Sequence, residues 1–456
     1  MTKSVPIGGA VDAAATAGLR EIDGRTVAWF RVAGGKHHGA LGAAGAAALA
    51  SAVQMGLDAR VPIVGVLDTS GAELRDNVAA LDGWGRIARA LAHASGVVPT
   101  VLTVIGPCVS GPALLLGLAD LVVMTTDSFA YVSGPDSVME FTGIVVDRST
   151  LGGAAMHSQM SGVASLVVTT EDEALGAVAD LLSFLPSYHL EDPPRVIAGD
   201  SDERSCVVAA GAVPAVAMAA YDVRVVVDDV LDTASFLELR AEYAANIVTG
   251  MGHLGGRAVG VVANQPAHRA GTLDIEASRK AARFVEFCDA FNLPIITFVD
   301  TPGFEPGRDL EWRGMIRHGA QLVHAYAAAT VPRICVVLRK AYGGAYIVMD
   351  SRGVGNDVCL AWPGAEIAVM GASGAVQILH GRRLSALEPA DQPVETQALV
   401  DEYEEAFSNP YRAAERGYVD AVIEAADTRR MLIRTLDALA TKRDHSPPRR
   451  HSNGPL

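Results

Sequence analysis

Two short apolar runs, each entered through a proline, recur in the same order in the two halves of the chain. In the first half PIVGVLD (62–68) precedes PTVLTVIG (99–106), and in the second half PIITFVD (294–300) precedes PRICVVLR (332–339). Continuous runs of Val and Ile are typical of strands that are buried on both faces of a parallel sheet. A chain with this pattern is expected to contain two α/β halves.

The residues that end these runs repeat as well. An Asp-Thr pair closes the first run of each half, and a glycine stands two positions beyond each threonine: Asp68-Thr69 with Gly71, and Asp300-Thr301 with Gly303. Glycine-containing turns, GPCVSG (106–111) and KAYGGA (340–345), follow the second run of each half. Any two α/β units have some turn residues of this kind at the ends of their strands, but the agreement in order and spacing favours an internal duplication. Residues 78–94 are expected to form a helix and residues 118–125 a further strand.

The boundary between the halves is expected in a polar segment, 187–205, which contains a Pro-Pro pair. We predict a first domain at residues 1–190, a linker and connecting segment at 191–232, and a second domain at 233–440. Residues 441–456 are rich in proline and charge, so we expect them to be a disordered tail.

Composition excludes several classes of protein. Half of the 456 residues are hydrophobic, which is enough for a large core, and a net charge of −15 is a poor match for nucleic acid. The uncharged stretch 94–119 is broken by three prolines, so a buried strand, a turn and a short helix are expected rather than a membrane span. Five scattered cysteines without a C-x-x-C pair indicate reduced thiols in the cytoplasm and no zinc ribbon.

The familiar catalytic motifs are missing. The sequence has no phosphate-binding G-x-x-x-x-G-K-[ST], no H-E-x-x-H and no G-x-S-x-G. The His37-His38 pair in a glycine-rich segment resembles a solvated turn more than a metal site. Cys108 has no partner base in the sequence and is expected to be a small buried residue. No metal is expected.

Glycines at strand ends are the strongest candidates for chemistry. Ser110-Gly111 and Gly343-Gly344-Ala345 each lie where a strand should give way to a helix. Ligands gather at the carboxyl ends of parallel strands, and a helix start offers free backbone N–H groups to an oxyanion. Two such turns would provide two oxyanion holes. The alternative, that these glycines only permit tight turns, stays open at this point.

Motifs along nearly the whole chain resemble one known family. They include LDIEASRKAARFVEFCDAFNLPIITFVDTPGFEPG (273–307), RKAYGGAYIVM (339–349), AWPGAEIAVMGASGAVQIL (361–379) and LGGAAMHSQMSG (151–162). The chain resembles the carboxyltransferase (β) subunits of biotin-dependent acyl-CoA carboxylases, of the actinobacterial acetyl-/propionyl-CoA carboxylase type. The resemblance implies an α/β fold of two crotonase-like ββα-repeat domains. It also implies a homohexamer within a larger complex.

The resemblance further implies a reaction. Carboxybiotin on a carrier releases CO2, the biotin removes the α-proton of an acyl-CoA, and the resulting enolate attacks CO2. Backbone amides stabilise both enolates. By position, Ser110-Gly111 corresponds to the pair that holds the thioester oxygen, and Gly344-Ala345 to the pair that holds the biotin ureido oxygen. Ile347 corresponds to the residue that lines the acyl pocket. The remaining expected substrate-binding residues are Gly71, Ala72 and Gly343.

The first half departs from the family pattern at three points. Glu73 stands where the family has an arginine near the path of coenzyme A, Ser110 replaces a glycine, and Pro112 cannot offer an N–H. Arg339-Lys340 and Arg279-Lys280 are candidates for local positive charge. Two interpretations follow: an active carboxyltransferase with an altered acyl site, or a non-catalytic or regulatory paralogue in a carboxylase complex. A decarboxylase or transcarboxylase subunit with the same fold is a third.

The interpretation that we favour is transfer of CO2 from carboxybiotin to the α-carbon of a short-chain acyl-CoA, acetyl- or propionyl-CoA. The sequence has no Met-Lys-Met biotinylation motif and no ATP-binding carboxylase region. Biotin is therefore expected on a separate biotin carboxylase/biotin carrier α subunit, with coenzyme A arriving as part of the substrate. No nucleic acid and no membrane are expected as partners.

Overall fold

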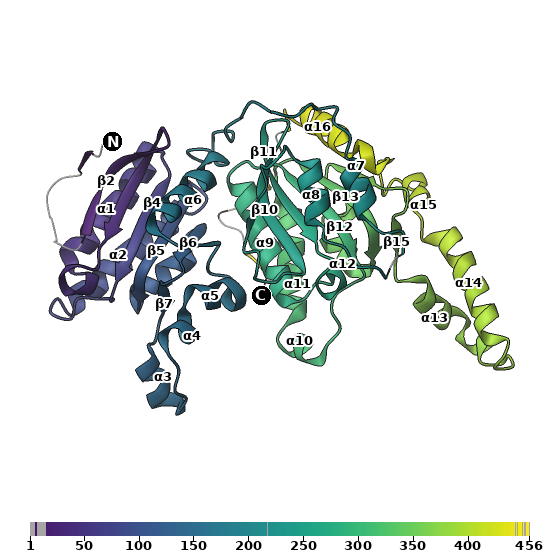
Figure 1. Cartoon of the computed structure of the whole chain (residues 1–456), viewed down its shortest axis with the longest axis horizontal. Coiled ribbons are helices and arrows are strands. Elements are labelled where there is room, and N and C mark those ends of the chain that lie inside the picture. Colours follow the sequence, from purple (N-terminus) through teal and green to yellow (C-terminus); the bar gives the residue numbers. More distant parts are fainter. Residues whose placement is uncertain are drawn as a thin grey trace. The chain divides into compact units, whose positions relative to one another are not determined.

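The computed structural model describes residues 5–6, 15–216, 218–442, 444, 446–448, 450 and 453–455, so part of the predicted tail lies outside the described residues. The chain forms two compact units. One contains Met1–Pro194 with Leu239–Tyr243 and Ala290–Asn292, and the other contains Arg195–Glu238, Ala244–Asp289 and Leu293–Leu456. Both are labelled by element in Figure 1.

The first unit is built on an eight-stranded sheet in the order β1-β2-β3-β4-β5-β6-β8, with β7 paired to β5. Only the β1–β2 and β2–β3 pairs are antiparallel, and the other pairs are parallel. The strands are β1 (Val5–Pro6), β2 (Ala15–Ile22), β3 (Arg25–Val32), β4 (Ile63–Thr69), β5 (Thr100–Val109), β6 (Leu121–Thr125), β7 (Phe129–Tyr131) and β8 (Leu166–Val168).

Helices of the first unit pack on this sheet. Leu49 of α1 and Ile87 of α2 share a buried core with Phe30, Leu67 and Leu102 of the strands. The helices are α1 (Ala43–Ala59), α2 (Val78–Ala94), α3 (Pro135–Thr142), α4 (Arg148–Gly152), α5 (Ala154–Met156) and α6 (Glu171–Ser183), with short turns η1 (Lys36–Gly39), η2 (Gly111–Leu118) and the π-helical η3 (His157–Ser161). A capping box between Thr170 and Glu173 fixes the start of α6.

The second unit also contains an eight-stranded sheet, in the order β16-β14-β13-β12-β11-β10-β9, with β15 paired to β13. The β10–β11 pair is antiparallel and the pairs from β11 to β16 are parallel. The strands are β9 (Leu237–Leu239), β10 (Ile247–Leu254), β11 (Arg257–Asn264), β12 (Ile295–Thr301), β13 (Arg333–Tyr342), β14 (Val358–Ala361), β15 (Glu366–Ala368) and β16 (Ala421–Val422).

Helices cover both faces of this second sheet. Val227 of α8 and Leu432 of α16 share a core with Val261, Phe298 and Val336 of one face. The helices are α7 (Val207–Ala212), α8 (Arg224–Val230), α9 (Ile275–Ala290), α10 (Arg308–Trp312), α11 (Met315–Ala328), α12 (Gly343–Val348), α13 (Ala372–Leu384), α14 (Gln392–Phe407), α15 (Pro410–Glu415) and α16 (Thr428–Ala438), with short turns η4 (Arg269–Gly271), η5 (Arg352–Val354) and η6 (Ala425–Asp427). On the other face, the hydroxyl groups of Thr297 in β12 and Tyr326 in α11 are hydrogen-bonded at 2.9 Å.

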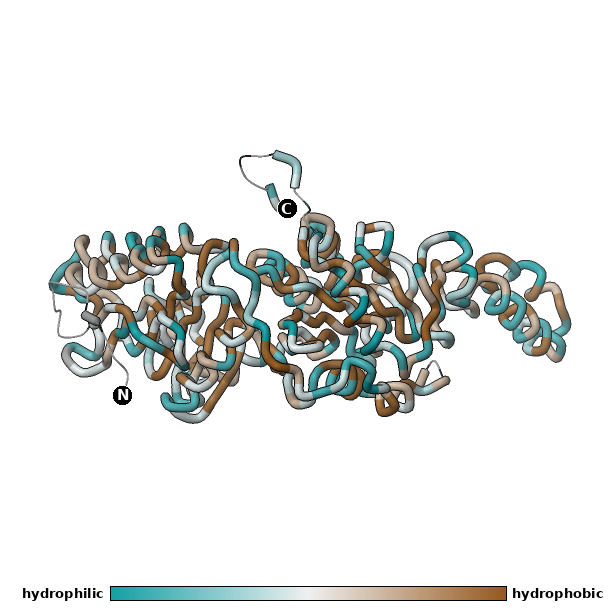
Figure 2. Tube along the Cα trace, turned by 90° about the horizontal axis from the view of Figure 1, so that it is seen from above, coloured by the Kyte–Doolittle hydropathy of each residue, from teal (hydrophilic) through white to brown (hydrophobic). Residues whose placement is uncertain are grey.

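Hydrophobic residues of the strands form the cores of both units, and Figure 2 colours the chain by hydropathy, with hydrophobic residues in brown. In the second unit, α13 and α14 form an arm that projects away from the sheet (Figure 1). The arm has a small core of its own around Val376, Leu384 and Leu399.

The two sheets repeat one arrangement. Reading β2 to β8 against β10 to β16 matches every strand, including the extra strand that pairs with β5 in one unit and with β13 in the other. Both sheets also carry an irregularity at the same place, between Leu67 and Thr69 and between Val299 and Thr301. The predicted duplicated α/β fold is therefore confirmed, and the helix predicted at residues 78–94 is α2.

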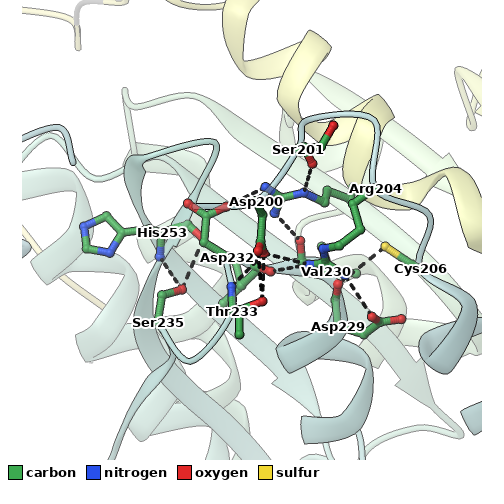
Figure 3. A network of polar contacts seen from close by, with 12 residues as sticks. Asp200, Ser201, Arg204, Cys206, Asp229, Val230, Asp232, Thr233, Ser235 and His253 are labelled. Carbon is green, nitrogen blue, oxygen red and sulfur yellow. Dashed lines mark hydrogen bonds and ion pairs between the residues drawn. The ribbon is translucent and has the colours of Figure 1, made fainter. Parts of the chain in front are cut away.

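The segment expected to connect the halves, 191–232, contains α7 and α8, whose side chains belong to the core of the second unit. A partly buried polar network holds this segment (Figure 3). Arg204 pairs with Asp229 at 3.0 Å, and Thr233 donates hydrogen bonds to Asp200. Residues up to Pro194 belong to the first unit, and the polar residues that follow are hydrogen-bonded within the second unit.

The stretch 94–119 contains the end of α2, β5 and η2, as expected. No helix among the described residues is both long and apolar enough to cross a membrane. All five cysteines are described, and each is buried and free of disulfide bonds.

Candidate active site

The site begins at an irregularity that both sheets share. Thr69 of β4 pairs with Cys108 of β5, and Thr301 of β12 pairs with Ala341 of β13. Between these pairs and the preceding regular pairs, β5 and β13 each contain two more residues than the strand beside them. Since the strands are parallel, their carboxyl ends meet at one edge of each sheet, where ligands of α/β folds gather.

In the first unit this edge carries the turn from β5 into η2. Ser110 adopts φ +65° and ψ −139°, a conformation that residues with a β-carbon rarely adopt. Its N–H donates to the carbonyl of Tyr131 at 2.9 Å, so it is not available to a ligand. The N–H of Gly111, the first residue of η2, donates to no acceptor among the described residues.

The second unit repeats this turn between β13 and α12. Counting from the paired positions Cys108 and Ala341, Ser110 matches Gly343 and Gly111 matches Gly344. The φ of Gly343, +59°, is close to that of Ser110. N–H groups in the first turn of a helix have no intrahelical partner, so Gly344 and Ala345 both present free donors. The residue that matches Ala345 is Pro112, which has no N–H.

A second turn lies beside each of these helix starts. A β-carbon on Gly71 would lie 3.4 Å from the β-carbon of Ser110, which places the Gly71-Ala72 turn against Ser110. The N–H of Gly71 donates to the Thr69 hydroxyl at 3.1 Å, and the carbonyl of Gly71 accepts a hydrogen bond from the N–H of Leu41. Within the described chain, the N–H of Ala72 has no protein acceptor. Ala72 and Gly111 therefore supply the free donors of the first amide site.

The second unit again matches. The N–H of Gly303 faces the Thr301 hydroxyl at 3.4 Å, and Leu273 bonds to the carbonyl of Gly303. Phe304 takes the place of Ala72, and a β-carbon on Gly344 would lie 3.5 Å from its ring. The second amide site thus consists of the N–H groups of Phe304, Gly344 and Ala345. Phe304 was not predicted, although alignment of the two Asp-Thr-x-Gly segments could have found it.

A left-handed backbone turn supports each site. His37, His38 and Gly39 have φ of +50°, +54° and +70°, and Arg269, Ala270 and Gly271 have φ of +48°, +54° and +74°. A β-carbon on Gly39 would lie 2.1 Å from the Asp68 carbonyl oxygen, and one on Gly271 would lie 2.6 Å from that of Asp300. Both glycines therefore permit a close backbone approach to the end of a strand.

The histidine pair has a structural partner. His37 Nδ1 lies 2.8 Å from a carboxylate oxygen of Glu73, whose other oxygen accepts the N–H of Arg75 at 3.1 Å. The hydrogen bonds from Arg75 and His37 lower the pKa of Glu73, so its charge is engaged locally. Among the described residues, no group of three or more His, Cys, Asp or Glu side chains could hold a metal ion.

Of the four cationic candidates, Arg339, Lys340 and Lys280 are buried, and Arg279 is exposed. Arg339 Nε donates to Asp300 at 2.9 Å, and its Nη1 donates to the carbonyls of Val216 and Ala219 at 2.9 and 3.0 Å. Lys280 donates to the carbonyl of Ile247 at 2.7 Å. Arg339 and Lys280 are hydrogen-bonded to groups of the second unit, so they are not available to bind phosphates.

Two further side chains singled out in the sequence, Cys108 and Ile347, differ in burial. Burial raises the pKa of Cys108 to about 12, which keeps it a neutral thiol and excludes a thiolate nucleophile. Ile347 lies on α12, three residues beyond Gly344, and 46% of it is exposed. An apolar side chain therefore faces outward beside the second amide site.

Comparison with known proteins identifies the family. The carboxyl transferase domain family matches residues 8–454. The chain belongs to the carboxyl transferase family. Among its relatives, the carboxyltransferase subunit of propionyl-CoA carboxylase from Haloferax mediterranei is 46% identical over 440 residues, 96% of this chain and 85% of the relative. The alpha subunit of methylmalonyl-CoA decarboxylase from Veillonella parvula is 41% identical over 96% of this chain and 84% of its own length.

Solved structures agree with this identification. Transcarboxylase 12S, whose crystal structure is described as a hexamer with methylmalonyl-coenzyme A bound, has a TM-score of 0.93 and 39% identity over 97% of this chain and 85% of its own. The predicted crotonase-like fold of this carboxyltransferase is thereby confirmed. The protein is an enzyme of the transferase class.

Proposed function

We propose that this carboxyltransferase moves a carboxyl group from carboxybiotin, held on a separate carrier subunit, to the α-carbon of a short-chain acyl-CoA. The observation that carries the proposal is the pair of matching amide sites, Ala72 with Gly111 and Phe304 with Gly344 and Ala345. Relatives named for propionyl-CoA carboxylase and a solved relative with methylmalonyl-coenzyme A bound support acyl-CoA as the substrate class.

The amide sites match the charge that this reaction develops. The acyl-CoA thioester oxygen becomes negative as the α-proton leaves, and fixed N–H donors stabilise such an oxygen without reorganisation. By its resemblance to the family, the Gly111 site is assigned to this oxygen and Gly344-Ala345 to the ureido oxygen of biotin. When bound, carboxybiotin supplies the carboxyl group, and its ring nitrogen takes the α-proton in return.

The second site fits the ureido oxygen of biotin, which becomes negative as CO2 leaves carboxybiotin. Its donors are backbone N–H groups, its wall is the ring of Phe304, and beyond that ring no other atom lies within 4 Å of a β-carbon built on Gly344. Fixed backbone N–H groups stabilise such an oxygen without a charged partner. The chain therefore contributes orientation and hydrogen bonds at this site.

The acyl chain and the coenzyme A path are also proposed from the described residues. Ile347 offers an apolar contact for a short acyl group and no charge for a carboxylate. The Glu73 carboxylate is hydrogen-bonded by His37 and by the backbone N–H of Arg75, so both of its oxygens have partners within this turn. Both observations favour an active enzyme over a non-catalytic paralogue.

We further propose a homohexamer that works with a biotin carboxylase/biotin carrier subunit. The arm α13–α14 exposes Ile378, Leu379, Val394 and Phe407, each more than half accessible. Apolar groups exposed in this way mark contacts with other chains, and the solved relative is described as a hexamer. Light scattering on the purified chain should give a mass of six copies, about 285 kDa from the 47.5 kDa chain.

The function is tested by labelled bicarbonate incorporation in the presence of ATP and a biotinylated α subunit from the same source. Acetyl-, propionyl-, butyryl- and malonyl-CoA are offered separately. Gly344→Pro removes the central N–H and should abolish incorporation, whereas Gly344→Ala keeps the N–H and meets only the Phe304 ring at 3.5 Å. We expect loss of at least about 100-fold for proline and less than about 5-fold for alanine.

The alternatives give different results. A chain that forms hexamers and binds the carrier but labels no acyl-CoA is a non-catalytic partner, and the proposal is then wrong. The decarboxylase alternative has the support of the Veillonella relative. It predicts transfer of the carboxyl group from methylmalonyl-CoA to the biotin of the carrier, which leaves propionyl-CoA, and no labelling that depends on ATP.

A further inference from the structure

The first amide site is one donor short of the second. Ala72 and Gly111 present free N–H groups, whereas Phe304, Gly344 and Ala345 present three. The difference is Pro112, which takes the place of Ala345 and has no N–H. Oxyanion sites lose about 100- to 1,000-fold in rate when one donor is removed. A chain that is active with Pro112 therefore needs a replacement donor.

An aromatic side chain covers the central glycine of each site, but the two differ in chemistry. The ring that faces Gly344 belongs to Phe304 and carries no polar atom. The ring that faces Gly111 belongs to Trp84 of α2, and a β-carbon on Gly111 would lie 2.9 Å from both its Cε2 and its Nε1. Trp84 is half-buried, and no acceptor among the described residues takes a hydrogen bond from its Nε1–H. An indole N–H thus lies beside the site that lacks an amide.

The distances allow both groups to reach one oxygen. By standard bond lengths, a β-carbon lies about 2.5 Å from the nitrogen of its own residue. The β-carbon built on Gly111 lies 2.9 Å from Trp84 Nε1. The Gly111 nitrogen and Trp84 Nε1 are then at most about 5.4 Å apart, which is the sum of the two distances. Two donors that each bind an oxygen at about 2.9 Å can be up to about 5.8 Å apart.

We propose that the indole Nε1–H of Trp84 is the third donor of the first amide site and binds the thioester oxygen of the acyl-CoA together with Gly111 and Ala72. This inference rests on the proposed function. It assigns Trp84 a catalytic role, in which the indole replaces the amide that Pro112 cannot provide.

The decisive variant keeps the shape of the side chain and removes only the N–H. Benzothienylalanine, which has sulfur in place of the indole nitrogen, is installed at Trp84 by genetic code expansion in the full chain and assayed with the α subunit. We expect kcat to fall about 100-fold while KM for the acyl-CoA changes less than about 3-fold, because the donor acts on charge that develops in the transition state. Trp84→Phe should give a similar kcat.

The matched control is benzothienylalanine at Trp29. This tryptophan pairs with Val64 near the start of β4, at the end of the strand remote from Thr69, and should keep wild-type kcat. A Trp84 variant with wild-type kcat overturns the inference while leaving the proposed function intact. A fall in kcat with an equal rise in KM indicates lost packing and also overturns it. If the wild-type chain labels no acyl-CoA, the inference falls with the proposed function.

Discussion

At the scale of single residues, Ser110 is the clearest sign that the first amide site has changed. Its φ of +65° with ψ −139° is a region that glycine enters freely and serine does not. The matching residue, Gly343, has φ +59° and no such strain. The backbone geometry has thus been kept although the residue that suits it was replaced.

Ser110→Gly is therefore expected to stabilise the protein. Relief of about 1–3 kcal/mol of backbone strain outweighs the added chain entropy of glycine, which is about 0.5–1 kcal/mol. The free energy of unfolding, measured by urea at fixed protein concentration, should rise by about 1 kcal/mol. Ser51→Gly, in the exposed middle of α1, is the control and should lower it by about 0.5 kcal/mol. An equal loss in both variants would show that Ser110 is unstrained.

Sequence reasoning reached the glycines of the site but not their companions. Gly111, Gly344 and Ala345 stand out because a strand-to-helix turn needs small residues and leaves N–H groups free. Trp84 lies 27 residues before Gly111 on a separate helix, and no local spacing signals their contact. The sequence also could not show that the N–H of Ser110 is taken by Tyr131, because that bond depends on pairing between β5 and β7.

At the scale of elements, α12 rests on a buried polar base. Asp350 follows the helix with φ +59°, is fully buried, and pairs with Arg333 of β13. Its carbonyl accepts the amide of Asn356 at 2.6 Å. Burial raises the pKa of the Asp350 carboxyl to about 7, a shift that Arg333 only partly opposes. The position of the second amide site is thus linked to a carboxyl group that titrates near neutrality.

The sign of this linkage is testable. Between about pH 4, the pKa of an unfolded aspartate, and about pH 7, the folded chain keeps a proton that the unfolded chain loses. Stability contributed by Asp350 is therefore present below pH 4, falls as the pH rises to 7, and is constant above it. The difference in unfolding free energy between wild type and Asp350→Asn should decrease over this window. Asp147→Asn, at an exposed cap whose pKa is lowered to about 2, should show no such trend above pH 5.

At the scale of the whole molecule, the duplication was predictable and the packing of the connecting segment was not. Strand order follows from apolar runs and their turns, which the sequence shows twice. Segment 191–232 was predicted to be a linker because the sequence shows its charged residues. It does not show the residues elsewhere in the chain that bind this segment. Arg429 of α16, which is fully buried, donates to the carbonyls of Ser201 and Val230 and to Asp232 at 2.6 Å.

Arg429 is therefore expected to hold the second unit together. Arg429→Met leaves Asp232 buried without its cation and should lower the free energy of unfolding by about 3–5 kcal/mol. Arg434 lies on the same helix as Arg429 and forms an exposed ion pair with Glu203. Arg434→Met removes this pair and should lower the free energy of unfolding by less than about 1 kcal/mol. Urea unfolding of both variants, followed by circular dichroism, checks this. Equal midpoints for the two variants would contradict the assignment.

The two-residue gain of β5 over β4, and of β13 over β12, has a consequence for how this enzyme can vary. The donors are placed by the number of peptide units between the end of one strand and the start of a helix, and hardly by the identity of the side chains. The residue types in these turns can therefore change without moving the donors that remain: Ser110 keeps the backbone geometry, and Pro112 removes its own N–H but leaves the length of the turn unchanged. Loss of a single residue from either turn would rotate the donors away. The length of each turn is therefore under stronger constraint than its amino-acid sequence.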